Sequence, residues 1–308
     1  MDVLGGSEVC NSDVELVHKP NWLKIRPSSN TDFSKIKDAL IKRGLVTVCE
    51  EAHCPNMSEC WHNEGTATFM VLGDTCTRGC RFCAINTAAK GQAIDPFEPL
   101  RLAEAIQEMG LDYAVITSVD RDDLEDGGSV HFANCIKMIK KKQPSTRVEV
   151  LIPDFQGNIE QLKNVVDAQP DVIAHNIETV KELQHKIRDR RANYEQSLSV
   201  LENVKKLNKK IFTKSAIMVG LEETKEQVIE AMKDLRKIDC DILTIGQYLK
   251  PKNKNLKVEK YIEPKVFDDY KKIGEELGFL YVASGPFVRS SYRAGELFMK
   301  NLLNRKSI

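Results

Sequence analysis

The sequence predicts an α/β protein built on a parallel sheet. From residue 67 onward, short β-rich apolar runs alternate with helical stretches. Six such β-then-α units follow one another at spacings of roughly 30 to 45 residues, which suit right-handed crossovers between parallel strands. The six units fit either a doubly wound open sheet or a curved, partial (β/α) barrel, and periodicity does not decide between the two.

The elements of this pattern can be assigned in chain order. The expected strands are 67–73, 113–118, 147–153, 172–178, 212–219 and 242–248. The helical patterns between them are 99–109, 130–141, 159–168, 194–207 and 225–238. A late apolar run at 279–284 is a candidate for an extra strand. Upstream of the sheet, an amphipathic stretch at 34–43 is stopped by Gly44, as expected of a helix end.

Length and charge limit the class of protein. The 308 residues hold 45 basic and 45 acidic side chains, so the formal net charge is zero. This balance argues against a generic nucleic-acid or membrane-surface binder. No stretch approaches the ~18 apolar residues that span a bilayer. The first eight residues contain acids and lack a basic start before an apolar run, so we expect no secretory or transit signal and a cytoplasmic location.

The nine cysteines are the most informative residues. In a cytosolic chain this many cysteines indicate metal binding rather than disulfides. Cys135 and Cys240 are expected to be small buried hydrophobic residues, and Cys10 a bystander in the terminus. The other six form two triads: Cys49, Cys54 and Cys60, and then Cys76, Cys80 and Cys83.

The second triad has the spacing C-x3-C-x2-C and directly follows the first predicted strand. Three thiolates on a tight loop can bind three irons of a cubane cluster, for which thiolates are the usual ligands. Gly79 lets the loop turn beside the inorganic core. The alternative, a structural zinc site, needs a fourth donor such as His53 or His62.

This motif, with Phe82 before its last cysteine, resembles the radical S-adenosylmethionine (SAM) superfamily. The resemblance implies a partial barrel and a [4Fe-4S] cluster whose open iron is chelated by SAM. It further implies that one electron cleaves SAM to a 5′-deoxyadenosyl radical, which abstracts hydrogen from an unactivated carbon.

The first triad has the spacing C-x4-C-x5-C and limits the resemblance to one family within this superfamily. Near the C-terminus the segment 285–294 contains Arg-Ser-Ser-Tyr. Together with segments 117–124, 175–179, 214–221 and 246–251, these features resemble the lipoyl synthase family over roughly residues 45 to 295. The resemblance implies an auxiliary [4Fe-4S] cluster on Cys49, Cys54 and Cys60, which donates sulfur and is consumed.

The resemblance also implies a serine as the fourth ligand of the auxiliary cluster. We favour Ser291 over Ser290, because adjacent residues of an extended chain point opposite ways and only one can ligate. The alternative is that both serines cap a helix beginning near Tyr292. The chain is accordingly divided into an N-terminal extension (1–66), a barrel (67–275) and a C-terminal segment that closes the auxiliary cluster (276–308).

Five residues are candidates for contacts with SAM. Asn176 and Glu178 lie two apart at a strand end, which puts them on one face, where they would hold the ribose or amino group; the alternative is a strand-end salt bridge. Lys214 would pair with the SAM carboxylate or Glu178, unless it faces the surface. Ser118 follows the second strand and is a further candidate, as is Arg121.

Other polar residues are expected to be structural. We expect a solvated acidic loop rather than a metal site at Asp122, Asp123, Glu125 and Asp126. Four histidines without ligand spacing are likewise expected to be structural: His53, His62, His131 and His175.

The resulting hypothesis is the insertion of two sulfur atoms at C6 and C8 of a protein-bound octanoyl-lysine. The implied partners are octanoylated carrier domains (a 2-oxoacid dehydrogenase subunit or the glycine-cleavage carrier protein), a one-electron reductant and a cluster-repair carrier. Alternatives are another radical SAM enzyme that inserts sulfur or methylthiolates, a non-catalytic iron–sulfur protein, and a zinc-stabilised binding module.

Overall fold

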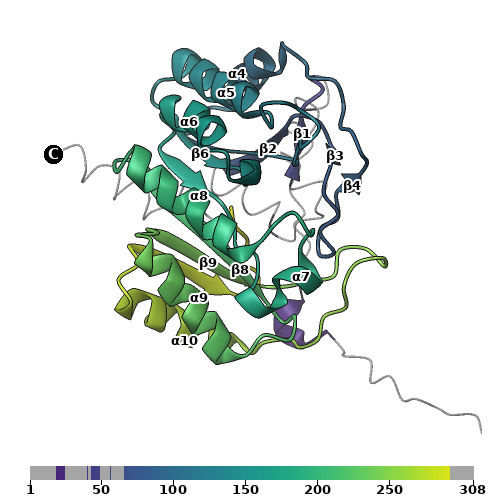
Figure 1. Ribbon diagram of the computed structural model, residues 1–308, viewed down its shortest axis with the longest axis vertical. Helices are drawn as coiled ribbons and strands as arrows, with labels where there is room; N and C mark the ends of the chain where they lie inside the picture. Colours follow the sequence, from purple (N-terminus) through teal and green to yellow (C-terminus); the bar gives the residue numbers. More distant parts are fainter. Residues whose placement is uncertain (1–18, 25–39, 41–42, 49–55, 57–65, 292–308) are drawn as a thin grey trace, which may run out of the picture.

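The computed structural model describes residues 19–24, 40, 43–48, 56 and 66–291 (Figure 1). Its main sheet has eight strands in the order β1-β2-β5-β6-β7-β8-β9-β10. The strands are β1 (Val46–Thr47), β2 (Thr66–Val71), β5 (Tyr113–Ser118), β6 (Arg147–Leu151), β7 (Val172–Ala174), β8 (Phe212–Val219), β9 (Ile242–Gln247) and β10 (Tyr281–Gly285). All neighbours pair in parallel except β1, which is antiparallel to β2.

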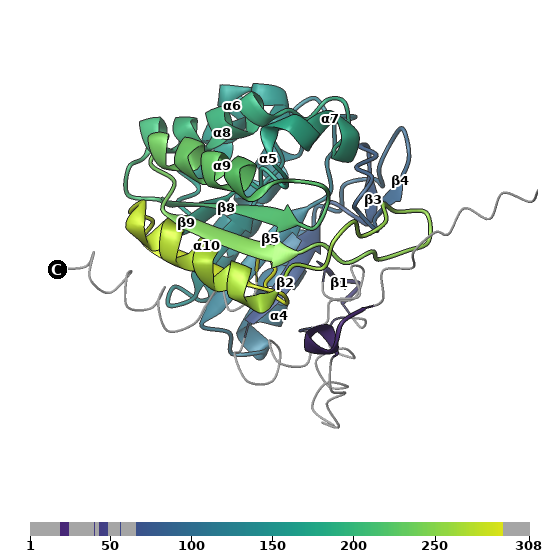
Figure 2. The same cartoon turned by 90° about the horizontal axis from the view of Figure 1, so that it is seen from below.

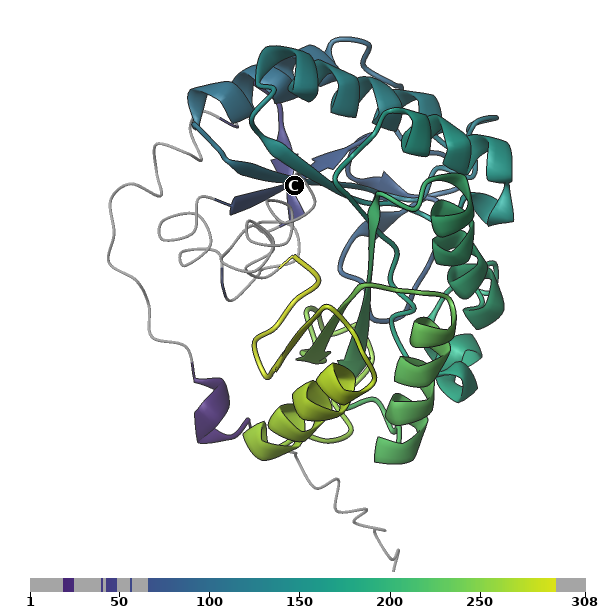
Figure 3. The ribbon, with the colours of Figure 1, turned by 90° about the vertical axis from the view of Figure 1, so that its left-hand side faces the viewer.

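The sheet is curved and open, since its end strands β1 and β10 do not pair with each other. Figure 3 shows the helices on the outer side of this curve, and Figure 2 shows the same layering from below. The long helices are α4 (Glu98–Glu108), α5 (Ser129–Lys142), α6 (Ile159–Asp167), α8 (Tyr194–Leu207), α9 (Lys225–Lys237) and α10 (Pro264–Glu276). The predicted α/β partial barrel is therefore confirmed.

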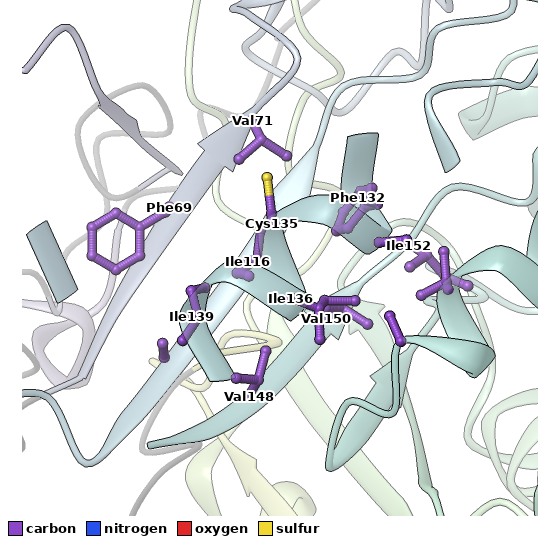
Figure 4. Packing of buried hydrophobic residues seen from close by; sticks show 14 of the residues in the cluster. Phe69, Val71, Ile116, Phe132, Cys135, Ile136, Ile139, Val148, Val150 and Ile152 are labelled. Atoms are coloured by element: carbon purple, nitrogen blue, oxygen red, sulfur yellow. The ribbon is translucent and has the colours of Figure 1, made fainter. Parts of the chain in front are cut away.

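Successive side chains of each strand point to opposite faces of the sheet, which explains how the helices cover its outer face. Outward residues such as Ile116 and Val150 pack against Phe132 and Ile136 of α5 (Figure 4). Cys135 belongs to this cluster and is fully buried, as is Cys240, so the prediction that both are core residues is confirmed. Burying a large apolar side chain of this cluster, such as that of Phe132, contributes about 1.5–3 kcal/mol to the stability of the fold.

An apolar cluster fills one end of the inner face. Tyr113, Val172, Phe212 and Ile242 begin their strands and pack together inside the curve, with Val115 completing the cluster. This apolar floor lies at the amino ends of the strands, which leaves the carboxyl ends for the polar residues. Enzymes built on barrels of parallel strands use that end.

Some elements differ from the sequence-based expectation. The strand expected at 172–178 ends at Ala174, because the Ser215 hydroxyl donates to the His175 carbonyl and accepts from the Ile177 N–H, which takes backbone groups out of the ladder. α10 was not predicted, nor were two short strands that pair beside the second cysteine triad, β3 (Thr75–Cys76) and β4 (Asn86–Thr87). Short helical turns at η1 (Asn21–Leu23), η2 (Phe155–Gly157), η3 (Lys181–Leu183) and α7 (Gln184–Ile187) complete the described elements.

Two expectations are not decided by the fold. The helix expected at 34–43 lies almost entirely outside the described residues. The division into 1–66, 67–275 and 276–308 stays a prediction, although β10 continues the main sheet as far as Gly285.

Candidate functional site

The second cysteine triad lies on the loop that leaves β2. The chain turns at Leu72 and Gly73, both with positive φ, and then carries Cys76, Cys80 and Cys83 past the carboxyl ends of the strands. Backbone N–H groups point at the sulfurs: Arg78 N lies 3.3 Å from Cys76 Sγ, and Asp189 N lies 3.3 Å from Cys80 Sγ. Such donors favour thiolate over thiol.

Burial acts in the opposite direction on these thiols. Desolvation raises the pKa of Cys76 and of Cys80 to about 12, and it raises the pKa of Cys83 as well. A cation is therefore needed to hold the three sulfurs deprotonated, which iron does in a cluster. Within the described part of the chain, no three His, Cys, Asp or Glu side chains converge on one metal ion. A cubane cluster does not need such convergence, because each thiolate binds a different iron.

Two residues far along the chain hold this loop from outside. The Asp189 carboxylate accepts from Gly79 N at 2.8 Å. Asn255, which is buried, donates from Nδ2 to the carbonyls of Arg81 (3.0 Å) and Cys83 (2.7 Å). These contacts hold the cysteine loop at its middle, at Gly79, and at its last cysteine, Cys83.

Arg78, inside the cysteine motif, ties the loop to two other strand ends. Its guanidinium donates to Asp122 through two bonds of 2.8 Å and to Asp154 through two bonds of 2.7 Å. Asp120 lies 3.5 Å from the same group, and its carboxylate lies 3.7 Å from Cys76 Sγ. Burial raises the pKa of Asp154, but the hydrogen bonds from Arg78 outweigh it and lower that pKa to about 2.

A cavity of about 410 Å³ lies next to this network. Asp120, Asp122 and Gln156 are among the side chains that line it. The residues that brace the cysteine loop thus also border an open polar space.

A second group of charges, which shares Asp120 with the first, lies beside Cys80 and Cys83. Asp120, Glu178 and Arg188 interact electrostatically with one another and with Cys80 or Cys83. Burial raises the pKa of Asp120 to about 6 and raises the pKa of Glu178, while Arg188 opposes both shifts. Arg188 is only 8% exposed, and it forms no salt bridge with a described carboxylate.

Several polar atoms beside these charges have no partner among the described residues. Arg188 donates from Nη1 to Gln184 and Ser197, but its Nε has no acceptor. Asn176 donates to Glu178 Oε1 at 3.2 Å, and its own Oδ1 is unpartnered. The Ser118 hydroxyl is also buried without a partner. Buried polar groups are normally satisfied, so unsatisfied ones here point to a ligand.

The structure separates two other predicted contacts from this group. Lys214 is buried and pairs with Glu149 at 2.7 Å rather than with Glu178, and Tyr113 donates to the other oxygen of Glu149. Arg121 is engaged by Asp123 and by the Leu72 carbonyl.

The acidic loop is also less solvated than expected. Asp122 and Asp123 each pair with a buried arginine, and Asp126 accepts from Gly128 N and Val130 N at the start of α5. His131 contacts Glu98, and His175 bonds Ile152 O and Ser197, both in structural roles as expected.

The first triad, Cys49, Cys54 and Cys60, lies outside the described residues, as do Cys10, His53 and His62. One residue within that segment is described. Asn56, 6% exposed, donates from Nδ2 to the Phe287 carbonyl at 2.6 Å. Ser290 and Ser291 follow Phe287 by three and four residues. Asn56, which stands between Cys54 and Cys60 in the sequence, is therefore in contact with the residues that precede the two serines.

Sequence reasoning missed five residues of this site: Arg78, Asp120, Arg188, Asp189 and Asn255. Asp120 could have been found, because it follows the end of a predicted strand, where barrel sites lie. The partners of the others are too distant in sequence to leave a local signal.

Comparison with known proteins first shows the superfamily to which the chain belongs. The model of the Radical SAM superfamily matches residues 70–235. Lipoyl synthases, in turn, match nearly the whole chain: one from Trichoplax adhaerens, named mitochondrial, is 53% identical over 94% of this chain and 83% of its own length. One from Arabidopsis thaliana, named chloroplastic, is 53% identical over 93% of this chain and 74% of its own. The chain belongs to the lipoyl synthase family, a family of radical SAM enzymes.

The lengths of the relatives differ from that of this chain. The chain spans 65% of the apicoplast lipoyl synthase of Plasmodium knowlesi, to which it is 52% identical over 94% of its own residues.

Solved structures agree on the fold alone. Methylornithine synthase PylB matches with a TM-score of 0.54 and 12% identity over 82% of each chain. The [FeFe]-hydrogenase maturase HydG matches with a TM-score of 0.54 and 14% identity, over 86% of this chain and 74% of its own.

The expected cytoplasmic location is wrong. The relatives are named as mitochondrial, apicoplast or chloroplastic proteins, which indicates an organelle. The expectation rested on the composition of one short segment, and such a segment does not fix the compartment. Among the described residues, no helix has the length and apolar character needed to cross a bilayer.

Proposed function

We propose that this protein is a lipoyl synthase, which inserts two sulfur atoms at C6 and C8 of an octanoyl chain amide-linked to a lysine of a carrier domain. The observation that carries the proposal is the contact between Asn56 and the Phe287 carbonyl. This contact supports the proposal that Cys49, Cys54 and Cys60 lie near the serine segment. An auxiliary cluster with three cysteine ligands and one serine ligand requires that arrangement. Membership of the lipoyl synthase family supports the same reading.

Cys76, Cys80 and Cys83 are proposed to hold the [4Fe-4S] cluster that binds SAM. When bound, this cluster supplies the electron that cleaves SAM. The protein's own part is to hold the amino-acid end of SAM in place. Asp120 and Glu178 offer carboxylates to its ammonium group, and buried Arg188 offers a guanidinium to its carboxylate.

The predicted contacts Asn176 and Ser118 complete this set, since each has a buried oxygen without a partner that could bond the amino group or the ribose. Lys214 is not needed for it, because its charge is already matched by Glu149. No side chain has a pKa suited to deprotonating an alkyl carbon, so these residues bind and orient rather than act as bases.

The auxiliary [4Fe-4S] cluster is proposed to lie on Cys49, Cys54 and Cys60, with Ser291, or else Ser290, as the fourth ligand. The proposed partners are octanoylated carrier domains of a 2-oxoacid dehydrogenase or of the glycine-cleavage system, a one-electron reductant and a carrier that rebuilds the consumed cluster.

Two cysteine variants test this division of labour. The reconstituted enzyme is given SAM, a reductant and an octanoyl-lysine peptide, and 5′-deoxyadenosine and thiolated peptide are measured by mass spectrometry. Cys80→Ala should form neither product. Cys54→Ala should still form 5′-deoxyadenosine but no thiolated peptide. If Cys54→Ala also loses SAM cleavage, the two triads do not divide the work in this way.

A further inference from the structure

We infer that Gly246 and Asn56 together form a seat that fixes the position of the serine segment, residues 287–291. This inference rests on the proposed auxiliary cluster and names the residues that bring its fourth ligand into place. Neither residue is proposed to touch the cluster, so both are positioning residues.

Gly246 leaves room for the serine segment at the end of β9. A Cβ atom at this position would lie 2.0 Å from the Val288 carbonyl oxygen and 3.0 Å from its carbon. Both are backbone atoms, so they cannot yield as a side-chain tip would. The chain at Val288 therefore rests directly on the strand, and only glycine permits that approach.

Two hydrogen bonds fasten the segment to other elements. On one side, Arg289 donates from Nη1 to the Gln247 carbonyl at 3.3 Å, and it also donates to the carbonyl of its neighbour Val288 at 2.7 Å. On the other side, Asn56 donates to the Phe287 carbonyl at 2.6 Å and is itself buried.

The position of Asn56 in the chain gives this contact its meaning. Cys54 precedes Asn56 by two residues, and two residues of chain span at most about 7 Å. Phe287 precedes the two serines by three and four residues. The Asn56 bond thus links a residue two positions from Cys54 to the segment that holds the proposed serine ligand.

The chemistry of the serine explains why such a seat is needed. An alkoxide oxygen is a hard ligand on a soft iron–sulfide cluster, so the bond itself gives little affinity. The fold must then hold the oxygen in place, as outer-shell residues do at other metal sites.

Two matched pairs of variants test the seat. Gly246→Ala pushes Val288 away, whereas the control Gly285→Ala, on the paired strand, meets only the Val288 Cγ2 methyl at 3.3 Å. Asn56→Asp sets a carboxylate against the Phe287 carbonyl. Its control, Asn164→Asp, removes a similar donor, the bond to Ser129 Oγ between α6 and α5.

The measurement is iron release to a chelator from the anaerobic holoenzyme, followed together with 5′-deoxyadenosine formation. In Gly246→Ala and Asn56→Asp, half of the iron should leave about 10- to 100-fold faster than in wild type. SAM cleavage should persist, and both controls should behave as wild type. Release no faster than in the controls overturns the seat. Wild-type protein with only about four irons, one cubane's worth, overturns the two-cluster proposal itself and the seat with it.

Discussion

Replacing Arg78 by methionine should destabilise the protein by about 3–5 kcal/mol, the usual cost of removing one partner from a buried charge network. The side chains of Arg78 and Asp154 are 3% and 0% exposed, so Asp154 would be left charged without a partner. A pKa near 2, against about 3.9 in an unfolded chain, by itself corresponds to roughly 2–3 kcal/mol at neutral pH. Unpaired Asp122 adds to that loss.

The assay is anaerobic thermal unfolding of the holoenzyme by calorimetry. At about 2 °C per kcal/mol for a chain of this size, the midpoint should fall by about 6–10 °C. Arg147→Met is the matched control, because its ion pair with Asp171 is 41% exposed on the arginine side and should contribute less than about 1 kcal/mol. Adding Asp154→Asn to Arg78→Met should restore part of the loss.

The reasoning is refuted if Arg78→Met shifts the midpoint no more than Arg147→Met. It is also refuted if Asp154→Asn adds a further loss to Arg78→Met, since the carboxylate would then not be the stranded charge.

Three further predictions follow from the buried polar groups. Arg188→Met should raise the Kd for SAM about 10- to 100-fold, the value of a charged hydrogen bond, as measured by calorimetric titration; an unchanged Kd contradicts the assigned role. Lys214→Met should cost about 3–5 kcal/mol by stranding Glu149, and adding Glu149→Leu should recover most of it, so equal unfolding midpoints for the single and double variants would contradict the pairing. Burial lowers the pKa of His175 to about 4, so the folded state resists the proton that the unfolded chain takes up below about 6.5. Stability should therefore fall by about 3 kcal/mol between these pH values, and a His175→Asn variant with the same slope in urea titrations would show that another group is responsible.

The strands at 113–118 and 212–219 could be predicted to the residue, because apolar runs between helical patterns are a strong local signal. The end of β7 could not, because it depends on one serine hydroxyl that reaches from the neighbouring strand. The two-residue strands β1, β3 and β4 are too short to show any periodicity.

The residues of the candidate site also fall into those that local sequence reveals and those that only the fold brings together. The second cysteine triad could be recognised because its three cysteines are close in sequence and follow a predicted strand, a pattern that resembles the radical SAM superfamily. Arg78 reaches Asp154 across 76 residues, and Asn56 reaches Phe287 across 231. Contacts of that kind are made by the fold and leave no local pattern. The wrong expectation that Asp122 is solvated has the same cause, since its partner Arg78 lies 44 residues away in the sequence.

The source of the inserted sulfur is the central claim of this account. In the most direct measurement, the clusters are rebuilt with heavy-isotope sulfide, and the enzyme then performs one turnover on an octanoyl-lysine peptide in unlabelled buffer. The mass of the peptide product is determined by mass spectrometry. The account predicts a peptide that carries two heavy sulfur atoms, and none from Cys54→Ala. A thiolated product with unlabelled sulfur would contradict it, because the sulfur would then come from outside the protein.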